Sequence, residues 1–180
     1  MKRVTTYATM MILTATLASA QTPAAAPDTG YTATIRSSWN SVKRYVAASA
    51  EKMPADQYGF KPTPEVRSFG ELVAHLANEH YLLCAPLKGE PNPMEKVDFE
   101  KTTAKAELVK AINDSIAYCD AAYAAAKDEP KTTAQFSATR RGTPFSTMLL
   151  NVTHDNEHYG NMITYLRMKG IVPPSSTPTR

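Results

Sequence analysis

Cysteine is scarce in this sequence of 180 residues, which contains only Cys84 and Cys119. Neither lies in a C-x-x-C motif or beside a histidine, and this absence argues against catalysis by a reactive thiol. An even number of cysteines favours a disulfide once a protein reaches an oxidising compartment. Pairing of Cys84 with Cys119 would close a loop of about 35 residues and, by the chain-entropy estimate, stabilise the fold by roughly 3–4 kcal/mol.

A large excess of charge of one sign is also lacking, because 20 lysines and arginines are balanced by 17 aspartates and glutamates. Arg140 and Arg141 form an isolated basic pair rather than a patch. Such a charge distribution offers no electrostatic footprint for a nucleic acid, so we expect no nucleic-acid partner.

Long apolar runs are absent, apart from one short run near the N-terminus. A basic start at Lys2 and Arg3 precedes this run, and the small residues Ala18-Ser19-Ala20 follow it. The run is shorter than the ~20 residues that span a bilayer, so residues 1–20 are predicted to be a secretory signal peptide rather than an anchor. We therefore expect an exported protein, periplasmic or extracellular, without stable membrane insertion. Residues 21–30, rich in proline and alanine, would form a flexible leader.

No stretch of the mature chain has the alternating apolar pattern of a β-strand. Four segments instead carry apolar residues at spacings of three and four, as amphipathic helices do. With their caps, these segments span approximately residues 31–52, 68–84, 103–127 and 143–170. The sequence therefore predicts an all-α fold, an antiparallel four-helix bundle over residues 31–174 with a C-terminal tail at 175–180. Connections longer than the ~2–8 residues of simple bundles leave a crossed topology open.

Histidine carries the clearest chemical signal, although the chain has only four. His154 and His158 are four positions apart on a predicted helix, so their side chains face the same way with Cβ atoms roughly 5–6 Å apart. Two imidazoles so placed can share a divalent ion, with a third ligand from a neighbouring helix and an open position for water or substrate. His75 and His80 are the candidates for the third ligand, but they lie about 140° apart around their helix and cannot both face one ion. Periodicity mildly favours His80 as the core-facing residue.

Three carboxylates, Glu79, Asp155 and Glu157, lie near these histidines in the sequence. Each could accept a hydrogen bond from a ligating imidazole, line the pocket or transfer a proton, or could simply be a solvated helix charge. The segment HDNEH at 154–158 also matches the H-x-x-E-H signature of a metallopeptidase class, with Glu157 as the base. No Asp, Glu or His follows His158 to supply the downstream ligand of that class, so we disfavour a peptidase and assign no catalytic residue.

Three segments together resemble the DinB/YfiT-like family: SFGELVAHLA at 68–77, HDNEHYGN at 154–161 and LRMKGIVPP at 166–174. The resemblance covers nearly all of the mature chain in the expected order. It implies a four-helix bundle that holds a divalent metal ion, usually zinc or nickel, through His75, His154 and His158. His80 then becomes a structural or pocket-lining residue. Members of the family include thiol-dependent transferases and isomerases, proposed hydrolases and many proteins of unknown activity.

Export bears on the choice among these activities. Small-thiol cofactors belong to the reducing cytosol, so we expect a metal-dependent hydrolase that uses metal-bound water in preference to a thiol-dependent transferase. A non-catalytic metal- or small-ligand-binding bundle is the main alternative, and a helical interaction domain without metal is a third. The sequence indicates neither the small-molecule substrate nor whether the bundle forms a homodimer.

Overall fold

The computed structural model describes residues 30–127, 134–135 and 141–177. The predicted signal peptide at 1–20, nearly all of the predicted leader at 21–30 and the end of the predicted tail at 175–180 lie outside the described residues. Within the described part of the chain, no helix is both long enough and apolar enough to cross a membrane.

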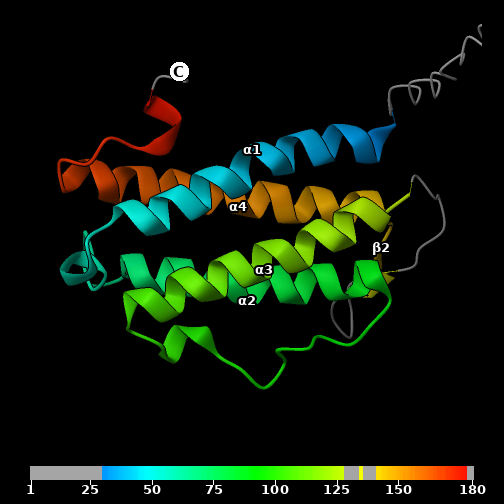
Figure 1. Cartoon of the computed structure of the whole chain (residues 1–180), viewed down its shortest axis with the longest axis horizontal. Helices are drawn as coiled ribbons and strands as arrows, with labels where there is room; N and C mark the ends of the chain where they lie inside the picture. The colour runs from blue at the N-terminus through cyan, green and yellow to red at the C-terminus, as the bar shows by residue number, and fades with distance from the viewer. Residues whose placement is uncertain (1–29, 128–133, 136–140, 178–180) are drawn as a thin grey trace, which may run out of the picture.

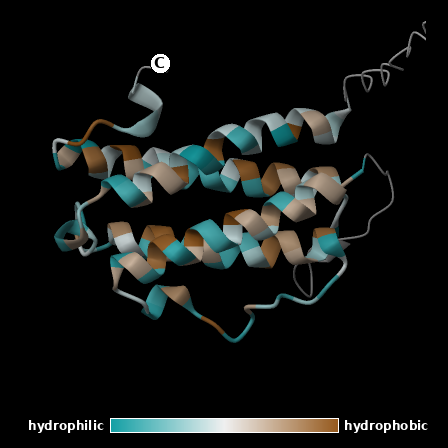
Figure 2. Ribbon diagram, in the orientation of Figure 1, coloured by the Kyte–Doolittle hydropathy of each residue, from teal (hydrophilic) through white to brown (hydrophobic). Residues whose placement is uncertain are grey.

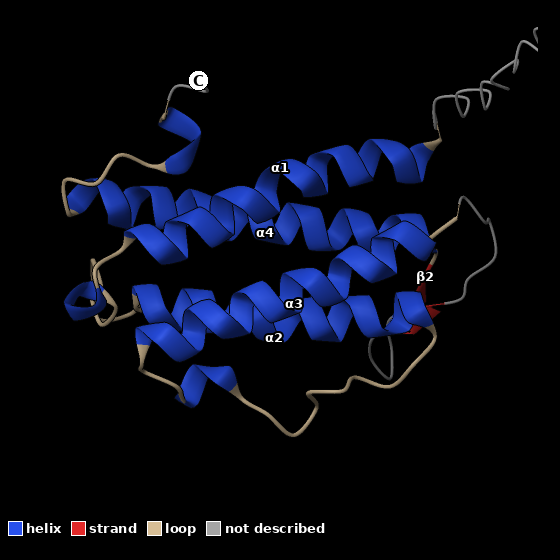
Figure 3. Ribbon diagram, in the orientation of Figure 1, coloured by secondary structure: helices blue, strands red, loops and turns tan. Residues whose placement is uncertain are grey.

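Four α-helices make up most of the described structure (Figures 1 and 3). They are α1 (Tyr31–Lys52), α2 (Phe69–Lys88), α3 (Lys105–Ala125) and α4 (Pro144–Met168). Single turns of 3-10 helix, η1 (Ala55–Gln57), η2 (Phe99–Lys101) and η3 (Pro174–Ser176), lie in the connections and near the C-terminus. Two residue pairs, β1 (Ala134–Gln135) and β2 (Arg141–Gly142), form a minimal antiparallel ladder. The predicted all-α fold is confirmed.

The helices form a bundle in which α1 packs on α3 and α4, and α2 packs on the same two helices. Figure 1 shows that α1 and α4 run in one direction while α2 and α3 run in the other. The parallel neighbours α2 and α3 are joined by residues 89–104, which return along the outside of the bundle and carry η2 (Figure 1). The bundle thus has the crossed topology that the long connections left open.

Local sequence signals explain where α2 begins and ends. Ser68 accepts a hydrogen bond from the backbone N–H of Glu71, and the Glu71 carboxylate accepts one from the N–H of Ser68, forming a capping box. The expected end of this helix near Cys84 is wrong, because α2 continues through Pro86 to Lys88. Proline removes only one backbone donor so close to a helix end, and termination waits for Gly89, whose φ of 70° suits glycine.

Each helix contributes apolar residues to one core. Figure 2 shows hydrophobic and hydrophilic residues interspersed along each helix, as in amphipathic helices. The stripe predicted for the third helix is buried along its whole length. Its members are Leu108, Ile112, Ser115, Cys119, Ala122 and Ala126. In α4, Met148, Val152, Met162 and Leu166 are buried as expected, whereas Leu149 is 38% exposed. Leu149 directly follows Met148, and a step of one residue around a helix with 3.6 residues per turn places its side chain outside the buried face.

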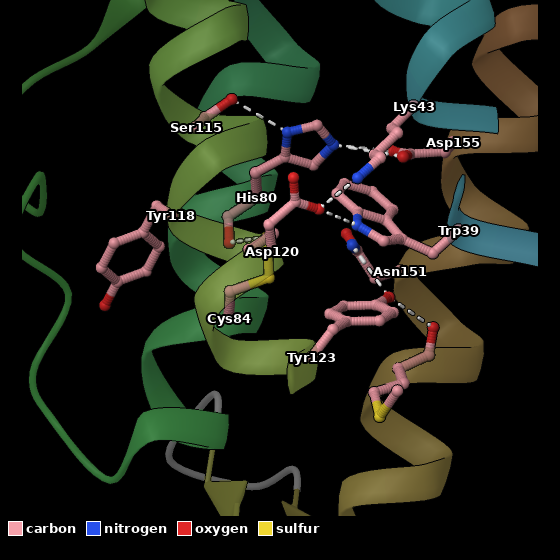
Figure 4. The surroundings of a disulfide bond; sticks show 12 residues. Trp39, Lys43, His80, Cys84, Ser115, Tyr118, Asp120, Tyr123, Asn151 and Asp155 are labelled. Carbon is pink, nitrogen blue, oxygen red and sulfur yellow. Dashed lines mark hydrogen bonds and ion pairs between the residues drawn. A yellow bond between two sulfur atoms is a disulfide. The ribbon is translucent and has the colours of Figure 1, made fainter. Parts of the chain in front are cut away.

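The predicted disulfide is present and joins α2 to α3 through Cys84 and Cys119, whose Cα atoms are 5.3 Å apart. Both cysteines are fully buried, and the bridge lies beside a buried polar group centred on His80 (Figure 4). The bridge thus links α2, the helix that carries His75, covalently to its neighbour α3.

His80 links three helices through hydrogen bonds within the core. Its Nδ1 lies 2.9 Å from Ser115 Oγ on α3, and its Nε2 lies 3.0 Å from Asp155 Oδ1 on α4 (Figure 4). Ser115 Oγ also lies 2.9 Å from the Ile112 carbonyl oxygen, so this hydroxyl joins the His80 ring to the backbone of α3. The His80 and Asp155 side chains are both fully buried, and both ring nitrogens of this histidine have hydrogen-bond partners within the core.

Candidate metal centre

Three histidines from two packed helices converge at one place. His75 lies two turns into α2, and His154 and His158 lie one turn apart on α4. Because α2 and α4 are neighbours in the bundle, the side chain of His75 meets the paired imidazoles of α4. One nitrogen from each of the three rings lies within 4.8 Å of the other two, so together they could hold a metal ion.

The distances between these nitrogens suit ligands of a common ion. His154 Nε2 lies 3.2 Å from His75 Nε2 and 3.1 Å from His158 Nε2. Tetrahedral bonds of 2.0–2.1 Å would separate ligand nitrogens by about 3.3 Å, and octahedral bonds of that length would separate them by about 2.9 Å. The observed spacing falls between the two values, so it fits a divalent ion without selecting the metal.

Protonation of the ring nitrogens also suits metal binding. Burial, followed in size by the neighbouring His154 and His75, lowers the pKa of His158 to about 4. Burial is also the largest cause that lowers the pKa of His154, with His75 acting in the same direction. Both rings are therefore neutral at pH 7, and neutral imidazole is the form that donates a lone pair to a metal. His154 Nδ1 is buried and finds no hydrogen-bond partner among the described residues.

Glu100 determines which nitrogen of His75 faces the cluster. Its Oε1 lies 3.0 Å from His75 Nδ1, and a carboxylate can only accept, so Nδ1 carries the hydrogen. The lone pair of a neutral His75 is then on Nε2, the nitrogen directed at His154. Asn161 plays a similar part at His158, since its side-chain amide lies 3.4 Å from Nδ1. A half-turn of that amide would place its oxygen to accept from Nδ1–H.

The crossover between α2 and α3 brings Glu100 to this position. Asn78, just beyond His75 on α2, accepts from the backbone N–H of Phe99 and donates to Asp98, so it holds η2 against α2. Asp98 in turn caps the backbone N–H of Glu100. Glu100 therefore reaches His75 from a segment 25 positions away in sequence.

A cleft of about 670 Å³ opens beside His158. It lies between the segment 61–67, which leads into α2, and the C-terminal half of α4, with Glu100 on its wall. The residues around it that matter for chemistry are Lys61, Arg67, Glu71, Glu100, His158 and Asn161. Such a volume accommodates a small molecule next to the histidine cluster.

A family model described as the DinB superfamily matches residues 38–162, a range that contains all three histidines and Glu100. The chain belongs to the DinB superfamily. The resemblance drawn from three sequence segments is thus confirmed at the level of the family. No curated protein matches this DinB-superfamily chain in sequence.

Solved structures share the fold of this DinB-superfamily chain. A DinB-like protein from Bacillus cereus ATCC 10987 has a TM-score of 0.65 at 14% identity, over 78% of this chain and 93% of that one. A DinB-like protein from Bacillus subtilis has a TM-score of 0.61 at 22% identity, over 81% and 99% of the two chains. A mycothiol-dependent maleylpyruvate isomerase has a TM-score of 0.61 at 15% identity, over 73% of this chain and 60% of that one. Identities this low establish a common fold and no more.

The structure separates the candidate residues into two groups. His75, His154 and His158 come together, whereas His80 lies apart from them in the core, bonded to Asp155. Glu79 is half-buried and raises the pKa of His154 through its charge, and Glu157 is exposed. Among the described residues, the carboxylate that hydrogen-bonds a histidine of the cluster is Glu100 rather than any of the three expected from the sequence.

Glu100 and Arg67 could not be identified from the sequence, because both lie in irregular connections where no periodicity places a side chain. The one available signal was the Asp98-Phe99-Glu100 segment, whose acidic pair can cap a short turn. That signal indicates a turn but not its neighbours, so it could not have linked Glu100 to His75.

Proposed function

We propose that this protein binds a divalent metal ion, zinc or nickel, through His75, His154 and His158. The convergence of three imidazoles, two of which have pKa values lowered by burial and the third of which hydrogen-bonds Glu100 through Nδ1, is the observation that supports this most directly. Three protein ligands leave coordination positions for a water or a substrate, which is typical of catalytic rather than structural sites.

We further propose that the protein is a metal-dependent hydrolase of a small molecule. A bound divalent ion would supply Lewis acidity and lower the pKa of a coordinated water toward ~7. The chain's own residues would hold the ligand set and position the substrate: Glu100 orients His75, and the cleft beside His158 admits a small molecule to that side of the cluster. A non-catalytic metal- or small-ligand-binding bundle, or a thiol-dependent transferase, is the alternative.

We also propose that the protein acts outside the cytosol, after removal of residues 1–20. The disulfide supports this, because such bridges persist in oxidising compartments. Expression of the full chain in a bacterium, followed by intact-mass analysis of the periplasmic fraction, tests the proposal. A mature chain beginning at Gln21 is expected, and an uncleaved chain found only in the cytosol would contradict it.

Metal content tests the site. Purified mature protein, reconstituted with zinc or nickel and measured by elemental mass spectrometry, should hold about one ion per chain. His75→Ala and His154→Ala should each lose it. Glu157→Ala is the matched control, since it alters an exposed residue adjacent to a ligand and should retain the ion.

Turnover then tests the reaction. Metal-loaded protein would be assayed on ester, amide and phosphoester substrates, with the His154→Ala variant as the blank. Activity that requires the ion supports a hydrolase. A full complement of metal with no turnover would favour the non-catalytic bundle, and turnover that requires an added small thiol would favour a transferase. Absence of metal after reconstitution would refute the whole proposal.

A further inference from the structure

Arg67 occupies an unusual position on the wall of the cleft beside the histidines. Its backbone carbonyl oxygen accepts a hydrogen bond of 2.7 Å from the Tyr165 hydroxyl of α4, and this bond holds the main chain in place. Its Nε lies 3.5 Å from Glu100 Oε2, the carboxylate whose other oxygen contacts His75. The main chain of Arg67 is therefore held by α4, and its guanidinium lies beside the carboxylate that contacts the candidate metal centre.

The terminal nitrogens of the Arg67 guanidinium are available for a ligand. Among the residues that the structure describes, neither Nη1 nor Nη2 has a hydrogen-bond or ion-pair partner, since the contact with Glu100 uses Nε alone. The side chain is 41% exposed and lines the cleft. A guanidinium presents its terminal nitrogens as a fixed fork that matches the two oxygens of a carboxylate.

The other charged groups that line the cleft are Lys61, Glu65, Glu71 and Glu100, and Glu65 accepts hydrogen bonds from its own backbone N–H and from Thr63. Lys61 lies 3.1 Å from Glu71, and Glu71 also accepts from the backbone N–H of Ser68 in the capping box. Glu100 is shared between His75 and Arg67. Of the two cations that line the cleft, Lys61 keeps N–H donors beyond its contact with Glu71, but Arg67 alone presents two terminal nitrogens in a fixed fork, and its charge acts on the neighbouring His158 ring.

We propose that the cleft binds a small organic acid, whose carboxylate is held by Nη1 and Nη2 of Arg67 while its reacting group reaches the open side of the histidine cluster. This inference rests on the proposed function, because it requires a metal ion on the three histidines. It adds the substrate class: a small hydrolysable molecule that carries a free carboxylate.

Hydroxamates provide a probe that reports on both ends of the site, because the hydroxamate group binds metal ions directly. We would titrate zinc-loaded protein with the mono-hydroxamate of succinic acid and with its methyl ester, by calorimetry. The acid should bind about tenfold more tightly than the ester, since a charged hydrogen-bond pair at a half-exposed site contributes at the lower end of its usual range.

Variants assign that preference to Arg67. Arg67→Met should bind acid and ester equally while keeping its zinc, and Arg67→Lys should retain only a small preference because it keeps the charge but loses the fork. Arg44→Met is the matched control: it removes the same charge from an exposed arginine on α1, whose Nε bonds only a carbonyl of its own helix, and should keep the tenfold preference.

The possible outcomes separate the two proposals. Equal binding of acid and ester by the wild type, or a preference that persists in Arg67→Met or disappears in Arg44→Met, would overturn the inference but leave the metal site in place. No hydroxamate binding by any zinc-loaded protein would overturn the open metal site itself. Tighter binding of the hydroxamate of 3-phosphonopropionic acid than of the succinic one would overturn the carboxylate assignment.

Discussion

Two carboxylates in this protein each contact a histidine at 3.0 Å. We expect removal of one to lower mainly the stability of the fold and removal of the other to weaken mainly the binding of metal. Asp155 pairs with His80, and both side chains are fully buried. Glu100 pairs with His75, and its side chain is 33% exposed. The histidine of the first pair lies in the core, whereas that of the second belongs to the candidate metal centre.

Asp155→Ala should lower the free energy of unfolding by about 3–5 kcal/mol, because it leaves a buried imidazole without its partner. Since a domain of this kind has a total stability of roughly 5–15 kcal/mol, the loss is a large fraction of the whole. Asp155→Asn should recover part of it, because the amide can hydrogen-bond a neutral His80. The folded fraction of either variant should keep its affinity for metal.

Glu100→Ala should have the reverse profile. Loss of an outer carboxylate typically weakens metal binding by 10- to 100-fold, and the exposure of Glu100 places the expected effect near tenfold. Its effect on the free energy of unfolding should stay below about 1 kcal/mol, as for other solvent-exposed ion pairs.

Both quantities would be measured on every variant. Urea denaturation followed by far-ultraviolet circular dichroism gives the stability of the metal-free protein, and competition with a chromophoric chelator gives the metal affinity. A folded Asp155→Ala protein that binds metal tenfold more weakly would show that the His80 pair supports the metal centre. Unchanged metal affinity in Glu100→Ala would show that the carboxylate does not orient His75.

Three further predictions concern stability. Replacing both Cys84 and Cys119 by alanine should lower the free energy of unfolding by about 4 kcal/mol for a loop of 35 residues; an unchanged urea midpoint would contradict this. Metal-free protein should lose stability as the pH falls from about 6.5 towards 4, because burial lowers the pKa values of His154 and His158 and the unfolded chain then binds more protons. Urea titrations across this range measure the loss, and asparagine at both positions should flatten the pH dependence. Gly70→Ala should cost about 1–3 kcal/mol by thermal or urea denaturation, since the added methyl would meet a tyrosine ring and carbonyl at 3.2 Å; wild-type stability would mean that the tyrosine yields freely.

The helices were predictable because their signals are local. Apolar spacing, the Ser68 capping box and the Thr143-Pro144 start of α4 act within one or two turns, and the structure contains each of them. The end of α2 was harder, because a proline in a last turn costs little and the left-handed Gly89 decides the boundary. The disulfide was predictable in identity, since only one pairing of two cysteines exists.

The candidate site shows where local information ends. That His154 and His158 face the same way follows from helix geometry alone, and the sequence determined it by itself. Whether His75 or His80 joins them depends on how α2 is rotated about its axis. That rotation is set by the packing of α2 on α3 and α4, and the choice of His75 was inferred only from family resemblance. The partnership of Glu100 with His75, and with it the placing of Arg67, depends on a crossover that folds back over α2. Only the tertiary structure decided those contacts, because they join segments that lie far apart in the sequence. No local sequence signal indicates which distant segments pack together.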